Sequence, residues 1–186
     1  MRLPVELSRA HRLINHGPTV LVSAEHAGRR NVMAAAWVMP LDINPPKLAV
    51  VLDKSTFTRG LIEATGRFAI SVPCRAQARL VTVLGKRSGH QEDKFASMPL
   101  PVLEEPQAQS PLLGGCVAWL DCARITRRKL ENVHDLFLAE VQGAWADSRV
   151  FSHGRWHFGP GQDAYRTLHH VADGHYFAIG EAVEGR

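Results

Sequence analysis

The residues best suited to chemistry lie in the stretch DKSTFTRGLI, where hydroxyl and cationic side chains gather at the start of a predicted helix. Lys54, Ser55, Thr58 and Arg59 are all hydrogen-bond donors, and the first turn of a helix adds free backbone N–H groups and a positive dipole end. This combination favours an anion, phosphate above all, because an Arg side chain binds two phosphate oxygens at once. The alternative is that Thr58 only caps the helix and Arg59 is solvated.

A run of small residues precedes that stretch and ends in a large aromatic one: Ala34, Ala35 and Ala36 are followed by Trp37. On a strand, these alanines leave the backbone bare on both faces. A planar ring can therefore lie against the strand and bond to its N–H and C=O groups, with Trp37 as one wall. The alternative is that the alanines face a neighbouring helix and Trp37 belongs to an ordinary core.

A third motif, GKRSGHQEDKF, joins two predicted helical segments. Ser88 lies in its loop and Lys94 lies beyond it, so the motif can supply a second set of phosphate contacts. The alternative is a plain helix–loop–helix connection with lysines on the surface.

Several other chemistries lack their sequence motifs. The chain contains no G-x-S-x-G, no P-loop and no G-x-G-x-x-G. His169 and His170 are adjacent, so on a strand they point to opposite faces, and SHGRWHFGPG has too much Gly and Pro for a helix that would pair His153 with His157. The three cysteines have no paired short spacing. No metal site is therefore predicted.

The elements that must position these residues are mostly short strands. The apolar patterns predict strands at 18–25, 31–39, 47–53, 67–73, 114–127 and 132–145, and helices at 5–14, 58–65, 75–85 and from about 91. The charged RRKLEN reads as the turn of a β-hairpin, 99–111 as a Pro-rich surface loop, and the residues from about 160 to 186 as an extended tail. Many short strands with few helices favour a barrel decorated by helices.

Composition predicts a single domain over residues 1–186, with 45% hydrophobic and 22% charged residues. There is no apolar run near the ~20 residues that span a bilayer, and the N-terminus has no signal-peptide core, so we expect a cytoplasmic protein without a membrane contact. The net charge is +4. Because the basic residues are scattered and no base-stacking motif is present, this charge suits small anionic ligands better than nucleic acid.

Together the three motifs resemble the flavin reductase-like family, which includes the flavoredoxins. The matching pieces are PTVLVSAEHAGRRNVMAAAWVMPLDINPPKLAVVLDKSTFTRGLIEATGRFAISVP, LGKRSGHQEDKF and ENVHDLFLAEV, in that order between Pro18 and Val141. The resemblance implies a mainly β fold, the FMN-binding split β-barrel, which is antiparallel and Greek-key-like with peripheral helices.

The resemblance also implies a site for FMN. The small-residue strand would border the isoalloxazine ring, and the two donor-rich segments would hold the ribityl chain and phosphate. The implied contacts are Asn31, Met33, Ala34, Ala35, Ala36, Trp37, Lys54, Ser55, Thr58, Arg59, Ser88 and Lys94. Family members often carry Thr and Ser where this chain has Ala34 and Ala36, so two hydroxyl contacts are expected to be missing and binding to be weaker.

The implied activity is hydride transfer from NAD(P)H to FMN, in which the flavin does the chemistry and the protein orients it. His134 matches a histidine that the family places near the nicotinamide, where it would position the donor without transferring a proton; the alternative is a strand histidine facing solvent. Two other functions stay open: a flavoredoxin-type electron carrier serving a protein partner, and a degenerate barrel without flavin. A homodimer is expected, with the Pro-rich loop and the tail at its interface.

Overall fold

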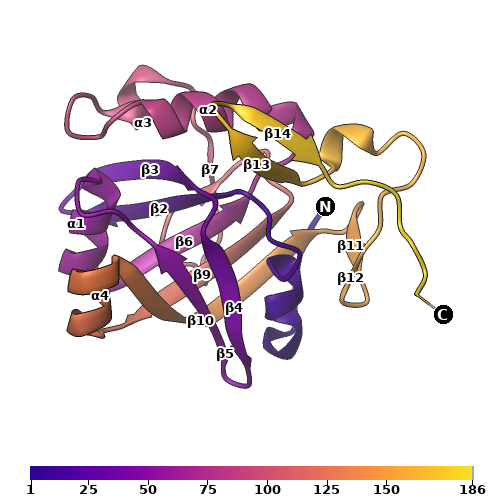
Figure 1. Cartoon of the computed structure of the whole chain (residues 1–186), viewed down its shortest axis with the longest axis horizontal. Coiled ribbons are helices and arrows are strands. Elements are labelled where there is room, and N and C mark those ends of the chain that lie inside the picture. The colour runs from indigo at the N-terminus through magenta and orange to yellow at the C-terminus, as the bar shows by residue number, and fades with distance from the viewer. Residues whose placement is uncertain (186) are drawn as a thin grey trace.

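One antiparallel sheet forms the centre of the protein. The structure, a computed structural model, describes residues 1–185. Its main sheet has the order β3-β2-β6-β9-β10-β5-β4, and β1 also pairs with β10. These strands are β1 (Arg2–Pro4), β2 (Val20–His26), β3 (Arg29–Ala35), β4 (Val38–Ile43), β5 (Pro46–Val51), β6 (Arg67–Val72), β9 (Ala118–Ile125) and β10 (Leu136–Asp147). The sheet curls, and the helices lie outside it (Figure 1), so the predicted mainly β, antiparallel architecture with peripheral helices is confirmed.

The sheet is covered on both faces, so it has two hydrophobic cores. Along β2, Val20 and Val22 belong to the core inside the curled sheet, whereas Leu21 belongs to a second core under the outer helices. This follows from the alternation of side chains along a strand. The same two-sided cover buries every residue of β6 from Phe68 to Val72.

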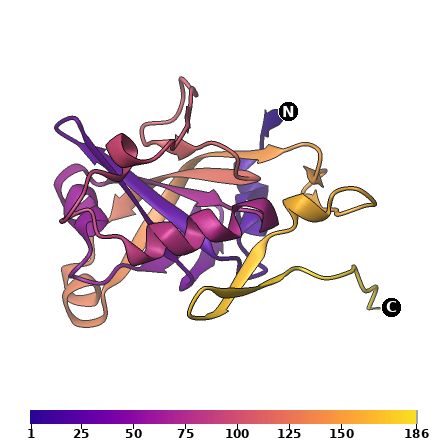
Figure 2. The same cartoon turned by 90° about the horizontal axis from the view of Figure 1, so that it is seen from above.

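Two helices cover the outer face of the sheet. They are α2 (Ala78–Lys86), which follows a short 3-10 turn η2 (Arg75–Gln77), and α3 (Lys94–Ser97). Figure 2 shows α2 lying across β2 and β3 when the molecule is seen from above. The helix α1 (Phe57–Thr65) packs at one end of the barrel and stops at Gly66, which adopts a φ of 69°, as the sequence predicts.

The predicted N-terminal helix is shorter and tighter than expected. It is the 3-10 helix η1 (Leu7–Leu13), and its Ala10 and Leu13 are buried in the inner core. Among residues 1–185, no helix is long and apolar enough to cross a bilayer.

The predicted strand 31–39 is in fact two strands. β3 ends at Ala35 and β4 begins at Val38, which pairs with Val50 of β5. The bend between them carries Trp37 out of the sheet, where 75% of its surface is exposed. Trp37 is therefore not a core residue, which was one of the two expectations for it.

The predicted hairpin turn between the last two long strands is wrong. The strands do pair antiparallel, with Leu138 opposite Ile125, but the helix α4 (Arg128–His134) joins them. His134 is therefore the last residue of a helix and not part of a strand. A tertiary contact explains the difference: the carboxylate of Glu131 is buried and bound by Arg124, and such contacts stabilise helices too short to form alone.

The C-terminal segment is not a simple extended tail. It contains a 3-10 turn η3 (Asp163–Tyr165) and a hairpin formed by β13 (Leu168–Ala172) and β14 (His175–Ala178). The turn residues Asp173 and Gly174 both adopt positive φ, 48° and 83°, as tight hairpin turns require. Backbone and side chain of Thr19 fasten the hairpin to the barrel: its N–H donates to Leu168 O, and its hydroxyl accepts from His170 N.

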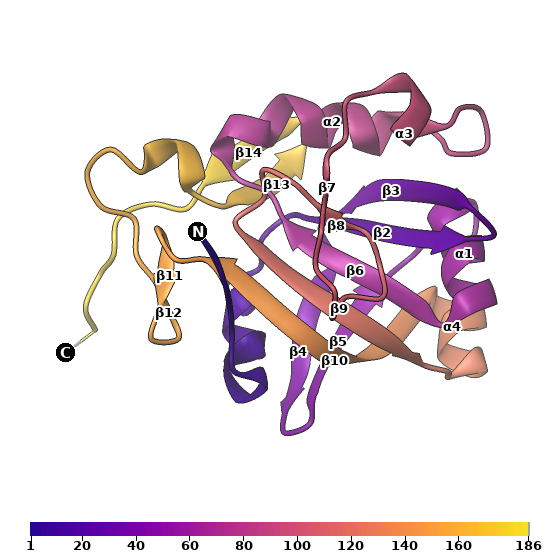
Figure 3. The same ribbon diagram turned by 180° about the vertical axis from the view of Figure 1, so that it is seen from behind.

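The Pro-rich segment 99–111 is also more ordered than expected. It crosses the outer face of the sheet (Figure 3), and its β7 (Val102–Leu103) pairs with β8 (Leu112–Leu113). Leu100 is buried in the second core, and Ser23 Oγ donates to Pro111 O at 2.6 Å. This loop is therefore part of the fold. A further small hairpin, β11 (Phe151–Ser152) with β12 (Arg155–Trp156), lies beyond β10.

Candidate functional site

A cavity of about 600 Å³ lies where β3, α2 and the β13–β14 hairpin meet. Its size falls in the range of small-molecule and cofactor sites. Six of the predicted site residues line it: Met33, Ala34, Ala35, Ala36, Trp37 and His134. Residues that the sequence did not mark complete the lining: Thr19, Val51, Asp53, Val81, Thr82, Gly85, Lys86, Asp135, His170, Asp173, Gly174 and Tyr176.

The first wall is the small-residue strand. β3 is at one end of the strand order, so one of its edges is not paired with another strand of the sheet. Ala35 packs on the inner core, whereas Ala34 packs on the outer core beneath α2. A side chain at Gly85 of α2 would begin 3.4 Å from the Cβ of Ala34. The strand β3 and the helix α2 therefore approach closely at this point. The small residues Ala34 and Gly85 line the cavity beside the contact.

Lys94 holds that strand and that helix together. Its side chain is buried, and Nζ donates to Val32 O of β3 and to Leu84 O of α2, both at 2.8 Å. Burial lowers the pKa of Lys94 to about 8. The structure therefore places this ammonium behind the wall, bonded to backbone carbonyls, and not in the cavity where a phosphate contact was expected.

The opposite wall is the C-terminal hairpin. The hydroxyl groups of Thr82 in α2 and Tyr176 in β14 hydrogen bond at 3.2 Å. The His170 ring meets the Tyr176 ring edge-on, with centroids 5.4 Å apart. A side chain at Gly174 would begin 3.0 Å from Thr82 Cγ2, so the turn of the hairpin also lies directly on the helix. Sequence reasoning missed this wall, although the Asp-Gly pair at 173–174 is a recognised hairpin signal.

The third side joins two segments that are far apart in the chain. Asp53 follows β5, and His134 and Asp135 end α4. Leu52 N donates to Asp135 O at 2.8 Å, which holds the two segments side by side. His134 is exposed on this side, and Trp37 stands near it at the mouth of the cavity.

A second cavity of about 450 Å³ is lined by Lys54, whose neighbour in the chain, Asp53, lines the first cavity. It lies at the start of α1 and is lined in part by Thr56, Phe57 and His90. No side chain caps α1, because the hydroxyl of its N-cap residue Thr56 donates to Asp53 O instead. The first-turn N–H groups of α1 are thus free of a side-chain acceptor, which is the arrangement that attracts an anion.

The predicted hydroxyl donors are less accessible than expected. Ser55 bonds to Asp53 through both its hydroxyl and its N–H, at 2.6 and 2.8 Å, and the hydroxyl bond lowers the pKa of Asp53. Thr58 is buried, and its Oγ1 accepts from Asn31 Nδ2 at 2.9 Å. Ser88 Oγ accepts from His90 N. None of these four predicted residues, Asn31, Ser55, Thr58 and Ser88, lines either cavity.

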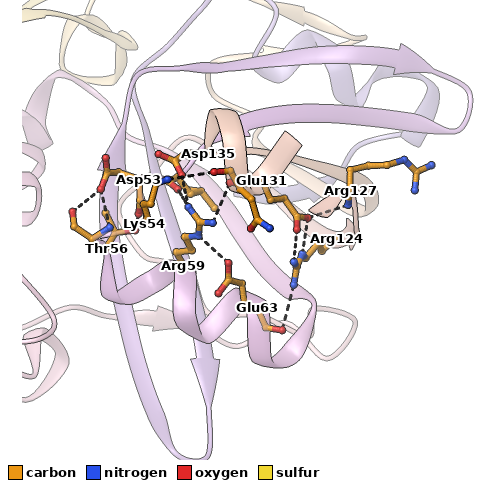
Figure 4. A network of polar contacts seen from close by, with 12 residues as sticks. Asp53, Lys54, Thr56, Arg59, Glu63, Arg124, Arg127, Glu131 and Asp135 are labelled. Atoms are coloured by element: carbon orange, nitrogen blue, oxygen red, sulfur yellow. Dashed lines mark hydrogen bonds and ion pairs between the residues drawn. The ribbon is translucent and has the colours of Figure 1, made fainter. Parts of the chain in front are cut away.

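Arg59 departs most from its predicted role. Its side chain lines the second cavity, but the residue is only 6% exposed and its guanidinium is engaged by the protein. Nε donates to Glu63, Nη1 to Asp135 and to Leu52 O, and Nη2 to Glu131 O. Figure 4 shows Arg59 at the centre of this network, between α1 and α4. A solvated Arg59, the alternative expectation, is excluded as well.

Among residues 1–185 there is no group of three or more His, Cys, Asp or Glu side chains arranged to hold a metal ion, and the three cysteines are free and buried. What the geometry offers is one cavity beside a strand edge and a helix, and a second cavity at an uncapped helix start. Such a pair suits a flat ring with an anionic end.

Comparison with known proteins agrees with the fold. The model of the flavin reductase like domain matches residues 12–179. The FMN-binding domain of a flavin reductases-like enzyme from Shewanella baltica OS155 has 46% sequence identity and a TM-score of 0.97, covering 100% of this chain and 98% of that one. The uncharacterized protein YddH of Escherichia coli (strain K12) is 43% identical over 97% of this chain and 96% of its own.

A more distant solved structure is also similar. The flavoredoxin of Desulfovibrio vulgaris (Miyazaki F) has 29% identity and a TM-score of 0.77, covering 90% of this chain and 89% of that one. The match to the family model spans most of the chain and includes both walls of the main cavity. With its antiparallel split barrel and peripheral helices, this chain therefore belongs to the flavin reductase-like domain family.

Proposed function

We propose that this protein binds FMN in the two cavities and is a flavin reductase-like oxidoreductase that transfers hydride from NAD(P)H to FMN. The observation that carries the proposal is the pair of cavities: Ala34–Ala36, Gly85 and Asp53 line the first, and the residue after Asp53, Lys54, lines the second at the uncapped start of α1. The first cavity suits the isoalloxazine ring, and the helix start suits the phosphate.

The residues present fit this cofactor. Ala34 and Ala36 have no hydroxyl to offer the ring, but the strand edge that carries them is not paired with another strand, so backbone N–H and C=O groups are available there. On the phosphate side, Lys54 is exposed at the second cavity and adds a positive charge beside the α1 N-terminus. The missing hydroxyls weaken binding without removing the site.

The chemistry of hydride acceptance and donation is supplied by FMN when it is bound. The protein's own residues would orient the flavin and shield it from water. Tyr176 and Thr82 close one side of the first cavity by their mutual hydrogen bond, which limits the access of water. Exposed at the mouth, His134 can donate to a nicotinamide carboxamide or, when charged, attract the dinucleotide phosphates.

The absorbance spectrum of the purified protein tests the first half of the proposal. Flavin bands in the protein fraction, or their appearance after FMN is added and excess removed, are expected. A protein that takes up no flavin would be a degenerate barrel, and the proposal would be wrong.

Oxidation of NADH and of NADPH with added FMN tests the second half. Turnover with either donor is expected. FMN binding without turnover would favour the second candidate, a flavoredoxin-type electron carrier. One observation supports that candidate: Trp37 places a large exposed apolar surface at the mouth of the cavity, where a protein partner can dock.

We also propose that the protein is a homodimer whose second copy covers the cavity mouth. The support is an apolar strip formed by four exposed side chains on and beside the edge strand β4, namely Trp37, Met39, Leu41 and Ile43. Because Trp37 belongs both to the strip and to the cavity, a second copy seated on the strip would enclose the site. The Pro-rich loop and the C-terminal tail, which the sequence suggests as interface, are not part of this strip.

A further inference from the structure

We infer that Arg59 is a positioning residue, which fixes the side of the cavity formed by residues 51–53 and 134–135 and does not bind the FMN phosphate. The inference rests on the proposed function, because it concerns the shape of the proposed flavin and nicotinamide site. It reverses the expectation from the sequence, in which an Arg at a helix start is a phosphate ligand.

Arg59 bonds to each segment of that side of the cavity. Nη1 donates to Leu52 O at 3.2 Å and to Asp135 Oδ1 at 2.5 Å, and Nη2 donates to Glu131 O at 3.1 Å. Leu52 directly precedes Asp53, and Asp135 directly follows His134. Arg59 of α1 therefore hydrogen bonds both to the end of β5 and to the end of α4 (Figure 4).

The guanidinium has little capacity left for a ligand. Of its five N–H donors, the bonds to Glu63, Leu52, Asp135 and Glu131 use four. Its carbon lies 5.1 Å from the centroid of the Phe137 ring, so one face is covered as well. One N–H of Nη2 remains, so a bidentate bond to phosphate would require Arg59 to break a bond to one of these partners.

The end of α4, which Arg59 binds, depends on these hydrogen bonds for its conformation. Asp135 is the C-cap of α4 and holds a left-handed conformation with a φ of 54°, which Asp adopts more readily than most residues but less readily than Gly. Its carboxylate accepts from Arg59, and its carbonyl accepts from Leu52 N. Without Arg59, Asp135 loses the bond that offsets its conformation, and His134 loses its fixed place at the cavity mouth.

The first experiment compares the dissociation constants of FMN and riboflavin, measured by equilibrium dialysis on wild type and Arg59→Lys. A positioning role changes both constants together, so their ratio stays within about twofold. A direct phosphate contact contributes to FMN only, and its loss lowers the preference for FMN over riboflavin by about tenfold or more. A selective loss of that size would overturn the inference.

The second experiment asks whether Arg59 acts through His134. Arg59→Lys and Asp135→Asn are each expected to raise the KM for NAD(P)H several-fold at little change in kcat. In a His134→Ala background, the same substitutions should add no further increase, because the group they position is gone. Equal increases in both backgrounds would contradict the inference.

Arg149→Lys is the matched control, since Arg149 also binds a carboxylate, that of Asp147, but lines neither cavity. It makes the same exchange of side chains and should leave KM within about twofold of wild type. Thermal melting of each variant shows whether it is folded, so a raised KM in a folded variant reports a change of position. If Arg59→Lys does not fold, Asp135→Asn tests the same contact. Wild-type protein that binds no flavin would refute the proposed function itself, whereas wild-type binding with a selective loss in Arg59→Lys would refute this inference alone.

Discussion

The proposed role of His134 in positioning the nicotinamide depends on the local structure at the end of α4. As the last residue of α4 it is followed by Asp135 in a left-handed conformation, so the chain turns sharply directly after it. This geometry places the imidazole at the mouth of the cavity. On the predicted strand, His134 would instead have shared one face with every second residue.

Replacing His134 should therefore affect the hydride donor and not the flavin. His134→Ala is expected to raise the KM for NAD(P)H several-fold, because one donor to the nicotinamide is lost, while the dissociation constant of FMN changes by less than about twofold. His134→Gln keeps a hydrogen-bond donor at similar reach, so its KM for NAD(P)H should lie between the values of wild type and His134→Ala. Unchanged kinetics in His134→Ala would return this histidine to a solvent-facing role and favour the electron-carrier function.

Of the predicted site residues, the alanine run and Trp37 line the main cavity, and their contact with a flavin stays a prediction. Two charged residues, Lys94 and Arg59, have side chains bonded within the protein instead. Lys94 and Arg59 were expected at the surface or on a ligand, since these residue types are almost never fully buried unless paired. Their partners are mostly backbone carbonyls of distant segments, Val32 and Leu84 for one and Leu52 and Glu131 for the other, which no local pattern reveals.

Elements with strong periodicity or clear stop signals were predictable. α1 and its glycine stop, the β2–β3 hairpin and the pairing of β9 with β10 all follow from the sequence. α4 was missed because its seven residues are held by a tertiary ion pair, in which the bonds from Arg124 lower the pKa of Glu131. The C-terminal hairpin was missed because its strands are exposed and lack an alternating apolar pattern.

That hairpin gives a test of the cavity wall. Gly174→Val should force the turn away from Thr82, because the new side chain would begin 3.0 Å from Thr82 Cγ2. The first cavity then opens, and FMN binding is expected to weaken by roughly fivefold, about 1 kcal/mol.

Gly161→Val is the matched control for this substitution. Gly161 has a similar φ, 77° against 83°, but nothing lies within 4 Å of its new side chain. Both variants carry the same backbone strain of about 1–2 kcal/mol, and only Gly174→Val should change the flavin dissociation constant. Equal losses of affinity in the two variants would show that strain, and not the wall, is responsible.

On the scale of the whole molecule, stability should depend on pH through His16. Its ring is packed against Trp156 and His169, and its Nε2 lies 3.0 Å from Thr167 Oγ1 at the base of the C-terminal hairpin. Burial, and to a lesser extent the charge of His169, lowers the pKa of His16 to about 4 in the folded protein.

Because the unfolded state binds a proton near pH 6.5 and the folded state only near pH 4, the unfolded chain holds more protons in this window. The free energy of unfolding should therefore fall as the pH drops from 6.5 to 4, by at most about 3 kcal/mol from this group. Urea unfolding at several pH values measures the slope. His16→Gln keeps a donor toward Thr167 and cannot titrate, so its slope should be smaller; an unchanged slope would exclude His16 as the cause.

The proposed dimer also belongs to this scale. We expect light scattering to give twice the mass of the chain at micromolar concentration, and Met39→Glu to give a monomer, because a buried unpaired charge opposes association. Leu3→Glu, at a residue of β1 that is 45% exposed and outside both the strip and the C-terminal tail, should remain dimeric. A monomeric wild type that still binds FMN would contradict the proposal.

The exposure of Trp37 also makes it an optical probe of the same site. Trp119 and Trp145 are buried, at 3% and 4% exposure, and Trp156 is half-buried, whereas Trp37 is 75% exposed at the cavity mouth. Collisional quenching of fluorescence by acrylamide therefore acts chiefly on Trp37. Resonance energy transfer to a bound flavin, and shielding by a second copy of the chain, would each change the emission of this one indole.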